Sequence, residues 1–503
     1  MGDPYYITTA ISYPNGPPHI GHAYEAIAAD AMARFQRSQG RDVRFQTGTD
    51  EHGLKMAQAA RNKGVEPRAF ADEMSRLFQD MCDTLNVSYD RFIRTSEADH
   101  YRASQAIWAA MEERGDLYLD RYEGWYSVRD EAYYEEEELV SADDGTKLSP
   151  QGTPVEWTIE ESWFFRLSKY QQPLLDLYSA NPEFIRPESR RNEVVRFVEG
   201  GLKDLSISRT SFDWGVPVPG SDNHVMYVWL DALTNYITGL GYPDDTELWR
   251  TYWPADVHLI GKDVVRFHAV YWPAFLMSAG IELPKQVYGH GFLLSRGEKM
   301  SKSVGNVVDP MALAERFGVD ALRYFLLREV TFGQDGSYSA EAIVSRANAE
   351  LANSFGNLAQ RTLSMIYKNL DGILPAHGES AEDRELLALV RGITSGEMVE
   401  QLNRFGFSFA IDAWMRAVFA CNAYVDAQAP WALRKTDPQR MAAVLGTLVA
   451  AVRQLAETIA PIIPTAAAKL IEAIDAGSGG APIAQPVPLF PRLELPEAED
   501  AAA

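Results

Sequence analysis

The chain opens with the stretch that decides its fold, YYITTAISYPNGPPHIGH at residues 5–22. Its first part, residues 5–12, is rich in aromatic and β-branched side chains, which is typical of a buried strand. The Pro- and Gly-containing segment 14–18 breaks this strand, and an alanine-rich helical pattern continues to Gln39. These residues predict a strand, a turn and a helix.

The next segment repeats the same order. Residues 42–47 form a second strand candidate, which ends in the polar loop 48–53, and residues 55–63 return to helical spacing. Strands that alternate with helices are the signature of a doubly wound parallel sheet. We therefore predict an α/β nucleotide-binding domain at the start of the chain.

This domain is predicted to be split. Residues 118–163 are rich in aromatic and acidic side chains, and their apolar residues recur at short intervals, which indicates a β-rich insertion. The sheet pattern then resumes with a helix at 225–239 and strands at 257–260 and 286–294.

The last part of the chain is predicted to be an α-helical bundle. Helical spacing extends to Ala476, with breaks near 372–375, 428–430 and 461–464. The predicted segments are a Rossmann-like first half at 1–117, a connective insertion at 118–204, a second half at 205–292, a loop and stem-contact region at 293–340, the helical bundle at 341–476 and a tail at 477–503.

Composition limits the class of protein. The chain has 503 residues, and 46% of them are hydrophobic, which is typical of a globular protein. Its net charge is −23, so its overall charge does not attract phosphate or anionic membranes. The bundle is nearly balanced in charge, with 12 basic and 15 acidic residues in 341–475, and is the more suitable face for RNA. Two distant cysteines, no signal peptide and no apolar run of ~20 residues predict a cytoplasmic protein without a membrane segment.

The first motif with chemistry is His19-Ile20-Gly21-His22, at the start of the first helix. The helix dipole and its free N–H groups favour phosphate there, and the two imidazoles, three residues apart, share a side. They are suited to donate to the phosphates of ATP, while Gly21 permits close approach of the base. The alternatives are a helix-capping turn with incidental histidines and half of a metal site.

The second motif is Lys299-Met300-Ser301-Lys302-Ser303, which follows a strand and lies between Gly297 and Gly305. Two lysines around a small polar residue can clamp a polyphosphate, and the glycines let the loop close. A solvated surface turn is the alternative for such a motif in isolation.

Together the two motifs resemble the signature motifs of the class I aminoacyl-tRNA synthetases. The chain is more specifically similar to the methionyl-tRNA synthetase family, from about Tyr6 to Glu494. The stretches that carry this similarity are AISYPNG at 10–16, GTDEHG at 48–53, YVWLDA at 227–232, GKD at 261–263 and QAPW at 428–431.

The resemblance implies a methionine site and an ATP site. The implied methionine site consists of Ile11, Tyr13, Asp50, Trp229, Ala232, Leu233, Tyr236, Asp263 and His268. The implied ATP site consists of His19, Gly21, His22, Lys299, Ser301 and Lys302, of which the two histidines and the two lysines are expected to be catalytic.

The implied methionine site makes physical sense. Trp229, Leu233 and Tyr236 fall at i, i+4 and i+7, on one helical face. Tyr13 and His268 are expected donors to the thioether sulfur, which accepts hydrogen bonds weakly and gains from aromatic contact. Asp50 is expected to hold the ammonium group. The alternative for the aromatic stripe is an ordinary core face.

The implied reaction couples methionine to tRNA. The methionine carboxylate attacks the α-phosphorus of ATP, which enters with Mg²⁺, and methionyl-adenylate and pyrophosphate form. The 3′ end of initiator or elongator tRNA(Met) then accepts the methionyl group. The family's anticodon residues correspond to Asn357, Arg361 and Trp431, a set suited to stacking and reading an unstacked base.

Two departures from the family's pattern lead to further expectations. Residues 118–165 contain no cysteine, so we predict no structural zinc. We expect no metal-ligating residues in the chain, and Mg²⁺ is expected only with the ATP. The chain ends soon after Pro491, which leaves no room for the appended domain through which some relatives dimerise, so we expect a monomer.

Three other functions are compatible with part of the pattern. A class I synthetase for another apolar amino acid has the same motifs, but those for branched residues usually carry a larger editing insertion. A small-molecule nucleotidyltransferase has a similar helix start without needing the bundle. A non-catalytic tRNA-binding protein would not need His19, His22 or the lysines.

Overall fold

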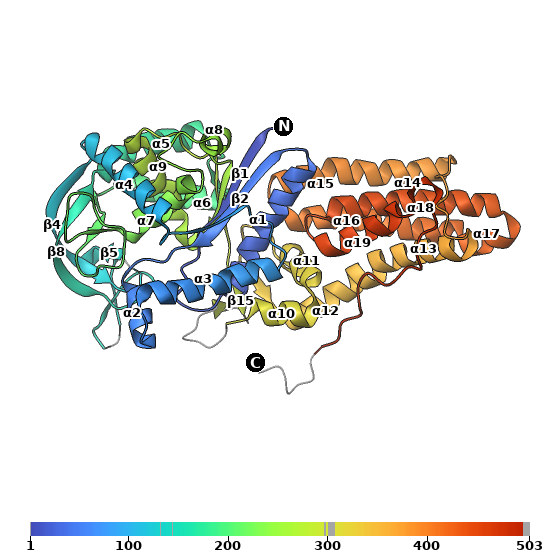
Figure 1. Cartoon of the computed structure of the whole chain (residues 1–503), viewed down its shortest axis with the longest axis horizontal. Coiled ribbons are helices and arrows are strands. Elements are labelled where there is room, and N and C mark those ends of the chain that lie inside the picture. Colours follow the sequence, from blue (N-terminus) through green and yellow to red (C-terminus); the bar gives the residue numbers. More distant parts are fainter. Residues whose placement is uncertain (1, 131, 143, 296–297, 300–306, 496–503) are drawn as a thin grey trace. The chain divides into compact units, whose positions relative to one another are not determined.

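The structure is a computed structural model that describes residues 2–130, 132–142, 144–295, 298–299 and 307–495. Its contacts divide the chain into two units. The first comprises Met1–Pro18, Gln39–Asp83 and Ser88–His290, and the second comprises His19–Ser38, Thr84–Val87 and Gly291–Ala503 (Figure 1).

A six-stranded parallel sheet forms the centre of the first unit, in the order β3-β2-β1-β13-β14-β9. Its strands are β1 (Pro4–Thr9), β2 (Asp42–Thr49), β3 (Arg91–Arg94), β9 (Ile185–Arg186), β13 (Val257–Gly261) and β14 (Val287–His290). β1 pairs with β2 on one side and with β13 on the other. The strand order therefore reverses at β1, and ligands of such sheets bind at the carboxyl ends of the strands at this switch point. The predicted doubly wound sheet is confirmed.

Among the described residues, eight α-helices and four shorter helical turns belong to this unit or begin in it. They are α2 (Leu54–Lys63), α3 (Pro67–Thr84), α4 (Ala98–Glu113), η1 (Glu136–Glu138), η2 (Leu167–Tyr170), α5 (Gln171–Ala180), α6 (Glu188–Glu199), α7 (Val228–Thr238), α8 (Glu247–Tyr252), η3 (Lys262–Val264), η4 (Phe267–Tyr271) and α9 (Trp272–Ala279). Trp108 on α4 and Trp272 on α9 are fully buried in the core of this unit. The helix expected from Val225 begins three residues later, because β12 (Val225–Met226) pairs with β11 (Ser208–Arg209).

The β-rich insertion is a second, antiparallel sheet with the order β10-β8-β4-β5. Its strands are β4 (Leu117–Ser127), β5 (Ala132–Tyr134), β8 (Glu156–Phe165) and β10 (Leu205–Ser206), and the short strands β6 (Val140–Ser141) and β7 (Lys147–Leu148) pair with each other beside it. Helices α5 and α6 and strand β9 also lie within the segment expected to be the insertion. Because β9 joins the edge of the parallel sheet at β14, this segment is not a purely β-rich body.

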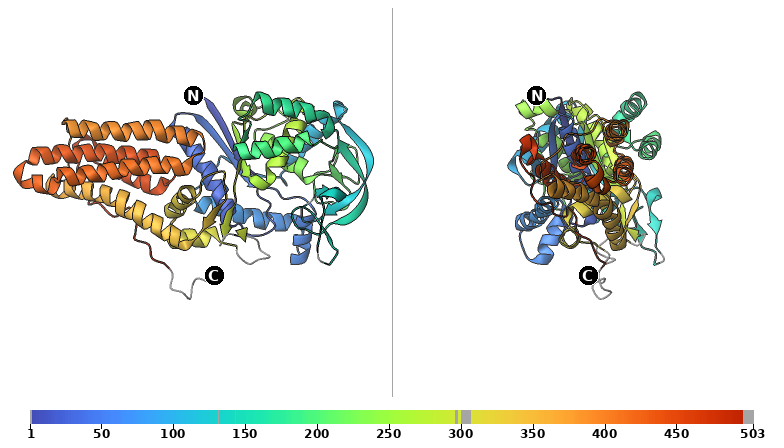
Figure 2. Two further views of the ribbon diagram at one scale, coloured as in Figure 1. Left: turned by 180° about the vertical axis from the view of Figure 1, so that it is seen from behind. Right: turned by 90° about the vertical axis from the view of Figure 1, so that its right-hand side faces the viewer.

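The second unit is mostly helical, as predicted. Its elements are α1 (Ile20–Ser38), β15 (Leu293–Ser295), β16 (Glu298–Lys299), α10 (Pro310–Phe317), α11 (Val319–Glu329), β17 (Gly336–Tyr338), α12 (Ala340–Arg346), η5 (Ala347–Gly356), α13 (Asn357–Asn369), α14 (Ala381–Gly392), η6 (Ile393–Glu397), α15 (Met398–Asn403), α16 (Phe407–Gln428), α17 (Pro430–Thr436), α18 (Pro438–Ile459) and α19 (Pro464–Asp475). The predicted helix breaks fall between α13 and α14, between α16 and α17, and between α18 and α19. Figure 1 shows the long helices running alongside one another, and Figure 2 shows the bundle end-on.

The strand expected over 286–294 is two strands, β14 and β15. They are separated at Gly291, where a Cβ atom would lie 2.2 Å from the backbone of Gln334. This close backbone approach ends β14 and lets β15 pair with β17 instead.

A fully buried arginine holds α1 within the second unit. Arg323 on α11 donates to the Asp30 carboxylate of α1 at 2.6 Å, to Ile462 O at 3.0 Å and to Leu85 O at 3.1 Å. Because both charges are buried, loss of one partner of such a pair costs about 3–5 kcal/mol. This explains why α1, which follows β1 in sequence, groups with the helical unit.

Helix α18 (Pro438–Ile459) is long and apolar enough, by length and composition alone, to cross a membrane, which differs from the expectation of no apolar run of this length. In the structure it packs against α13, α14, α16, α17 and α19, and most of its apolar side chains are buried there. Its composition is explained by its place at the centre of the bundle.

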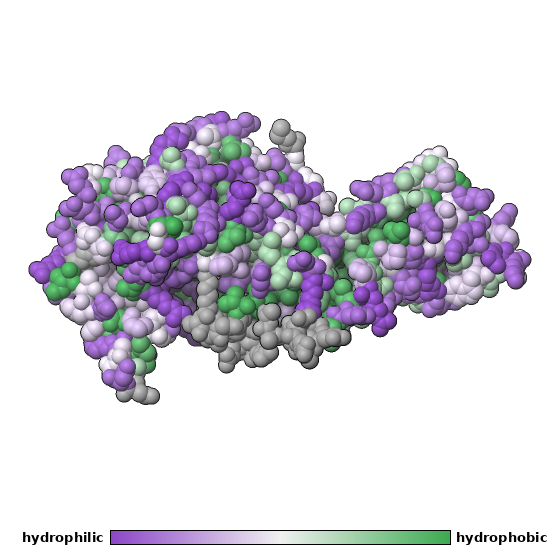
Figure 3. Space-filling view, turned by 60° about the horizontal axis from the view of Figure 1, so that its bottom comes forward, coloured by the Kyte–Doolittle hydropathy of each residue, from purple (hydrophilic) through white to green (hydrophobic). Residues whose placement is uncertain are grey.

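On the face shown in Figure 3, hydrophilic residues predominate and hydrophobic residues form small patches.

Candidate active site

The loops after β1 and β2 are joined at the switch point of the parallel sheet. Ser12 N donates to Gly48 O at 2.9 Å, and Asp50 N donates to Ser12 O at 2.8 Å. The Tyr13 hydroxyl, from the first loop, donates to His52 O, in the second, at 2.9 Å. Two residues of the expected methionine site, Tyr13 and the buried Asp50, are thereby fixed in adjacent loops.

Two other expected residues follow strands at the same edge. Ile11 precedes Ser12 and is half-buried, and its neighbour Ala10 bonds through its N–H to Leu259 O on β13 at 3.0 Å. Asp263 lies on η3, directly after β13, and its side chain is exposed. The carboxyl ends of β1, β2 and β13 thus carry Ile11, Asp50 and Asp263 respectively.

Helix α7 presents the expected apolar wall. Ala232, Leu233 and Tyr236 are buried, and Trp229 is half-buried. The Trp229 ring stacks on Phe267, with ring centroids 3.8 Å apart and an interplanar angle of 5°. Phe267 was not anticipated from the sequence, because nothing in its local pattern separates it from an ordinary core residue.

His268 is held next to this wall by both of its ring nitrogens. Its Nδ1 donates to Val264 O at 2.9 Å, so its Nε2 accepts from the Tyr236 hydroxyl at 2.6 Å. Burial lowers the pKa of His268 to about 4, and the bond to Val264 opposes this only in part. His268 is therefore a neutral imidazole at physiological pH.

The expected sulfur donors have their protons directed elsewhere. The single Tyr13 hydroxyl proton goes to His52 O, and the Tyr13 hydroxyl oxygen accepts from Met56 N at 3.2 Å. The His268 ring proton goes to Val264 O. Recognition of a thioether by either side chain stays a prediction, and it requires one of these bonds to open.

A buried cluster lies behind the loop that carries Asp50. The Asp231 carboxylate on α7 accepts from His52 Nδ1 at 2.7 Å and from His100 Nε2, on α4, at 2.6 Å. His52 Nε2 lies 2.9 Å from the Tyr101 hydroxyl, and His100 Nδ1 lies 3.0 Å from Thr238 Oγ1. The motifs at 48–53 and 227–232 contain His52 and Asp231, but no spacing in the sequence connects them with His100.

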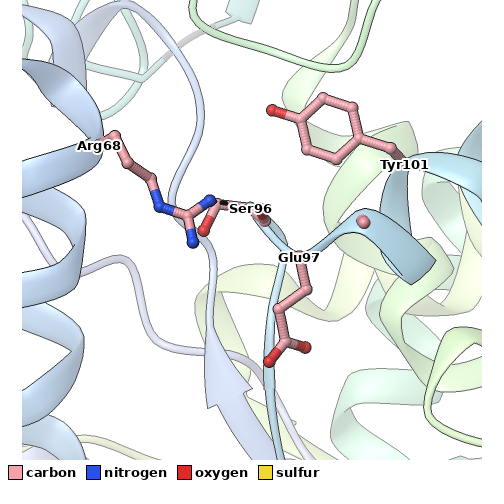
Figure 4. A pocket seen from close by; sticks show the side chains of 5 residues that line it. Arg68, Ser96, Glu97 and Tyr101 are labelled. Carbon is pink, nitrogen blue, oxygen red and sulfur yellow. Dashed lines mark hydrogen bonds between the residues drawn. The ribbon is translucent and has the colours of Figure 1, made fainter.

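Tyr101 also lines a surface pocket of about 660 Å³. The other lining residues are Arg68, Ser96, Glu97 and Ala98. Arg68 reaches from α3 and donates to Ser96 O at 2.7 Å, while the Tyr101 ring stands on the other side (Figure 4). The buried cluster therefore approaches solvent at Tyr101.

The charge state of Asp231 makes a testable contribution to stability. Burial would raise its pKa, but the charge and hydrogen bonds of His52 and His100 outweigh burial and lower the pKa to about 2 from an ordinary 3.8. A carboxyl group whose pKa is lower in the folded chain than in the unfolded chain stabilises the fold at pH values above the unfolded pKa. For Asp231 this stabilisation is about 2 kcal/mol, and it is lost as the pH falls from about 4 to about 2.

We therefore expect the thermal midpoint of Asp231→Asn to lie below that of the wild type at pH 7, and the gap to narrow between pH 4 and pH 3. Thermal unfolding of both proteins at each pH measures this. A gap that stays constant or widens in acid would contradict the assignment.

The first phosphate motif lies at the start of α1, in the second unit. His19 N donates to His22 Nδ1 at 3.1 Å, and Gly21 N donates to His19 Nδ1 at 3.1 Å. Since both Nδ1 atoms accept, the ring proton of each neutral imidazole is on Nε2, an atom whose N–H group can donate to a phosphate. A Cβ on Gly21 would lie 2.9 Å from the His19 ring, so this position favours glycine.

The second phosphate motif is only partly described. Lys299 is in β16 and its backbone pairs with Leu294 in β15. Ser301 and Lys302 lie outside the described residues. Their expected roles at ATP, and that of the Lys299 side chain, remain predictions.

The expected anticodon residues lie on two helices of the bundle, and two of them are in contact. Asn357 and Arg361 are one turn apart on α13, and the Arg361 guanidinium lies 5.4 Å from the centre of the Trp431 ring on α17. Trp431 is 48% exposed, although it is a large aromatic side chain. Arg361 also pairs with Asp426 at 3.5 Å. An exposed indole beside a guanidinium is suited to stacking an unpaired base.

Among the residues that the structure describes, no group of three or more His, Cys, Asp or Glu side chains is arranged to hold a metal ion.

The sequence of this chain matches two family models and many curated relatives over most of its length. The model of class I tRNA synthetases (M) matches residues 5–363, and the model of the anticodon-binding domain of methionyl-tRNA ligase matches residues 375–484. The methionine–tRNA ligase of Brucella suis biovar 1 (strain 1330) is 58% identical over 97% of this chain and 98% of its own length. That of Mycobacterium tuberculosis (strain ATCC 25618 / H37Rv) is 55% identical over 98% of this chain and 99% of its own length.

The chain belongs to the methionyl-tRNA synthetase family. A solved structure of the Mycobacterium tuberculosis methionyl-tRNA synthetase in complex with methionyl-adenylate matches it with a TM-score of 0.94 at 55% identity, over 97% of this chain and 100% of that one. The protein is thus an ATP-using methionine–tRNA ligase of class I, and the resemblance, the fold class and the enzymatic activity expected from the sequence are confirmed. A synthetase for another amino acid and a small-molecule nucleotidyltransferase are not favoured.

Proposed function

We propose that this methionine–tRNA ligase binds methionine at the carboxyl ends of β1, β2 and β13. Asp50 binds the ammonium group together with the Ile11 carbonyl, and Asp263 supports the site. The side chain lies against Trp229, Ala232, Leu233 and Tyr236, near Tyr13 and His268. The observation that carries the proposal is the pairing of Ser12 with Gly48 and Asp50, which places a buried carboxylate beside the loop after β1.

ATP enters with Mg²⁺ as a substrate. We propose that His19 and His22 donate through Nε2 to its phosphates, that Gly21 admits the nucleotide base, and that Lys299, Ser301 and Lys302 act on the phosphates as well. These groups stabilise the charge that builds on the leaving pyrophosphate. The methionine carboxylate forms a bond to the α-phosphorus, the bond to the β-phosphate oxygen breaks, and methionyl-adenylate results.

The second substrate is proposed to be initiator and elongator tRNA(Met). Asn357 and Arg361 read the edge of an anticodon base that stacks on Trp431. The exposed indole next to Arg361 supports this proposal, because about half of its surface is accessible to a base that stacks on it.

Other expectations accompany this proposal. We propose that the enzyme works as a cytoplasmic monomer, without a structural zinc or a membrane partner. The segments 1–117, 118–204, 205–292, 293–340, 341–476 and 477–503 remain the proposed functional division of the chain.

Trp431→Ala tests the tRNA part of the proposal. Loss of one base–indole stack costs about 1–3 kcal/mol, so kcat/KM for charging tRNA(Met) should fall about 5- to 150-fold. Methionine-dependent ATP–pyrophosphate exchange, which needs no tRNA, should be unchanged. Both rates are measured on the same preparation.

Phe419→Ala is the matched control, because Phe419 is an equally exposed aromatic side chain on α16 of the same bundle. It should charge tRNA(Met) as the wild type does. Equal losses in the two variants, or a loss of exchange in Trp431→Ala, would count against an anticodon role.

A further inference from the structure

The bond between His52 and Asp231 joins two parts of the proposed methionine site. His52 follows Asp50 by two residues in the loop after β2. Asp231 lies on α7 between Trp229 and Leu233. Both side chains are almost completely buried, and their polar atoms are 2.7 Å apart. The bond therefore connects the loop that presents the carboxylate with the helix that presents the apolar wall.

This bond continues a row of polar contacts that β2 makes with α7 and with Gly239, the residue after α7. Arg44 donates to Gly239 O at 3.0 Å, and Gln46 donates to Asn235 Oδ1 at 2.8 Å. The helix partners Asp231, Asn235 and Gly239 are spaced four residues apart, so they form one row along α7. The first two contacts hold the strand itself, whereas the His52 contact holds the loop beyond the end of the strand.

The partners of the bond are fixed from a third element, α4. His100 donates to the other oxygen of Asp231 at 2.6 Å and lies 3.0 Å from Thr238 Oγ1. Tyr101 contacts the far nitrogen of His52 at 2.9 Å. The His52 ring also packs edge-on against Trp214, with centroids 5.2 Å apart. Neither the His52 imidazole nor the His100 imidazole can rotate without losing a buried hydrogen bond. The bond between His52 and Asp231 is therefore held rigidly.

We propose that His52 and Asp231 are positioning residues that set the distance between Asp50 and the wall of α7, and that they thereby determine the affinity of the enzyme for methionine rather than for ATP. This inference rests on the proposed methionine site. A supporting group that is displaced by about 1 Å is enough to cost a large factor in binding or rate. The residues of the phosphate motifs belong to the second unit, whereas His52 and Asp231 belong to the first.

Two substitutions of His52 separate positioning from general stability. In His52→Asn the amide nitrogen takes the place of Nδ1 and keeps the bond to Asp231, while the contact with Tyr101 is lost. In His52→Gln the amide takes the place of Nε2 and keeps Tyr101, while the bond to Asp231 is lost. Both remove the same ring from Trp214.

The control is Gln46→Met, which removes a buried contact between β2 and α7 without touching the loop. The readouts are KM for methionine, KM for ATP and kcat in ATP–pyrophosphate exchange, together with the thermal midpoint. We expect His52→Gln to raise KM for methionine about tenfold or more, and to change kcat and KM for ATP less than about threefold. His52→Asn and Gln46→Met should keep KM for methionine within about threefold of the wild type.

The proposal is overturned if His52→Asn and His52→Gln raise KM for methionine equally, or if Gln46→Met raises it as much as His52→Gln. Should His52→Gln fail to fold, Tyr101→Phe and His52→Asn decide instead, since both remove the contact between His52 and Tyr101 and keep the bond between His52 and Asp231. We expect both variants to keep KM for methionine and KM for ATP within about threefold of the wild type, and a rise of about tenfold or more in KM for methionine in either variant contradicts the proposal. Failure of the proposed function itself would be visible separately, as absence of methionine-dependent exchange in the wild type.

Discussion

Replacing His22 with alanine is expected to lower methionine-dependent ATP–pyrophosphate exchange by about 10²- to 10³-fold, the effect of removing one donor that is aimed at developing charge. The Nδ1 atom of His22 accepts the backbone N–H of His19, so its proton is on Nε2. The alanine variant removes that donor. The loss should appear mainly in kcat, because the charge on the phosphates builds up as pyrophosphate leaves.

His22→Gln provides the matched comparison. The amide nitrogen of glutamine lies close to the position of Nε2 and can donate a hydrogen bond, so this variant should recover at least part of the activity. The thermal midpoints of both variants should stay near that of the wild type, because His22 is only half-buried. A nearly normal kcat of the alanine variant would contradict a catalytic role of His22.

The second large effect is expected for Asp50→Asn. If the buried carboxylate binds the ammonium group of methionine, neutralising it costs about 2–5 kcal/mol, so kcat/KM for methionine should fall about 30-fold or more. The loss should appear chiefly as a higher KM. Exchange kinetics over a range of methionine concentrations measure it.

A methionine analogue without the amino group, 4-(methylthio)butanoate, tests this assignment atom by atom. It has no ammonium group for Asp50 to bind, so as a competitive inhibitor it should bind the wild type and Asp50→Asn with similar affinity. Methionine should bind the wild type far better than it binds the variant. If Asp50→Asn weakens the binding of the analogue as much as it weakens the binding of methionine, Asp50 maintains the structure of the site and does not bind the ammonium group.

Regular patterns in the sequence predicted most of the fold. The apolar run at residues 5–12 and the turn after it gave the first strand and helix, because local burial and Pro and Gly punctuation decide such elements. The same holds for the helices of the bundle and their breaks. The two-residue strand β9 has too few residues to show a period, so its addition to the parallel sheet was not visible in the sequence.

The residues of the candidate site could be predicted from the sequence only where they stand in a motif. Asp50 and Trp229 stand in recognisable stretches, and the structure places them at the switch point and on α7. His100 stands in no such stretch, and its bond to Asp231 spans 131 positions. Contacts of this kind arise from the packing of α4 against α7, which no local pattern encodes. The directions of the Tyr13 and His268 protons likewise depend on carbonyl groups that only the folded chain brings near.

The most direct test of the account is ATP–pyrophosphate exchange by the wild-type protein with each of the twenty amino acids in turn. The account predicts rapid exchange with methionine alone. Exchange that is driven best by another amino acid would contradict the proposed methionine site, and no exchange with any amino acid would contradict the activity itself.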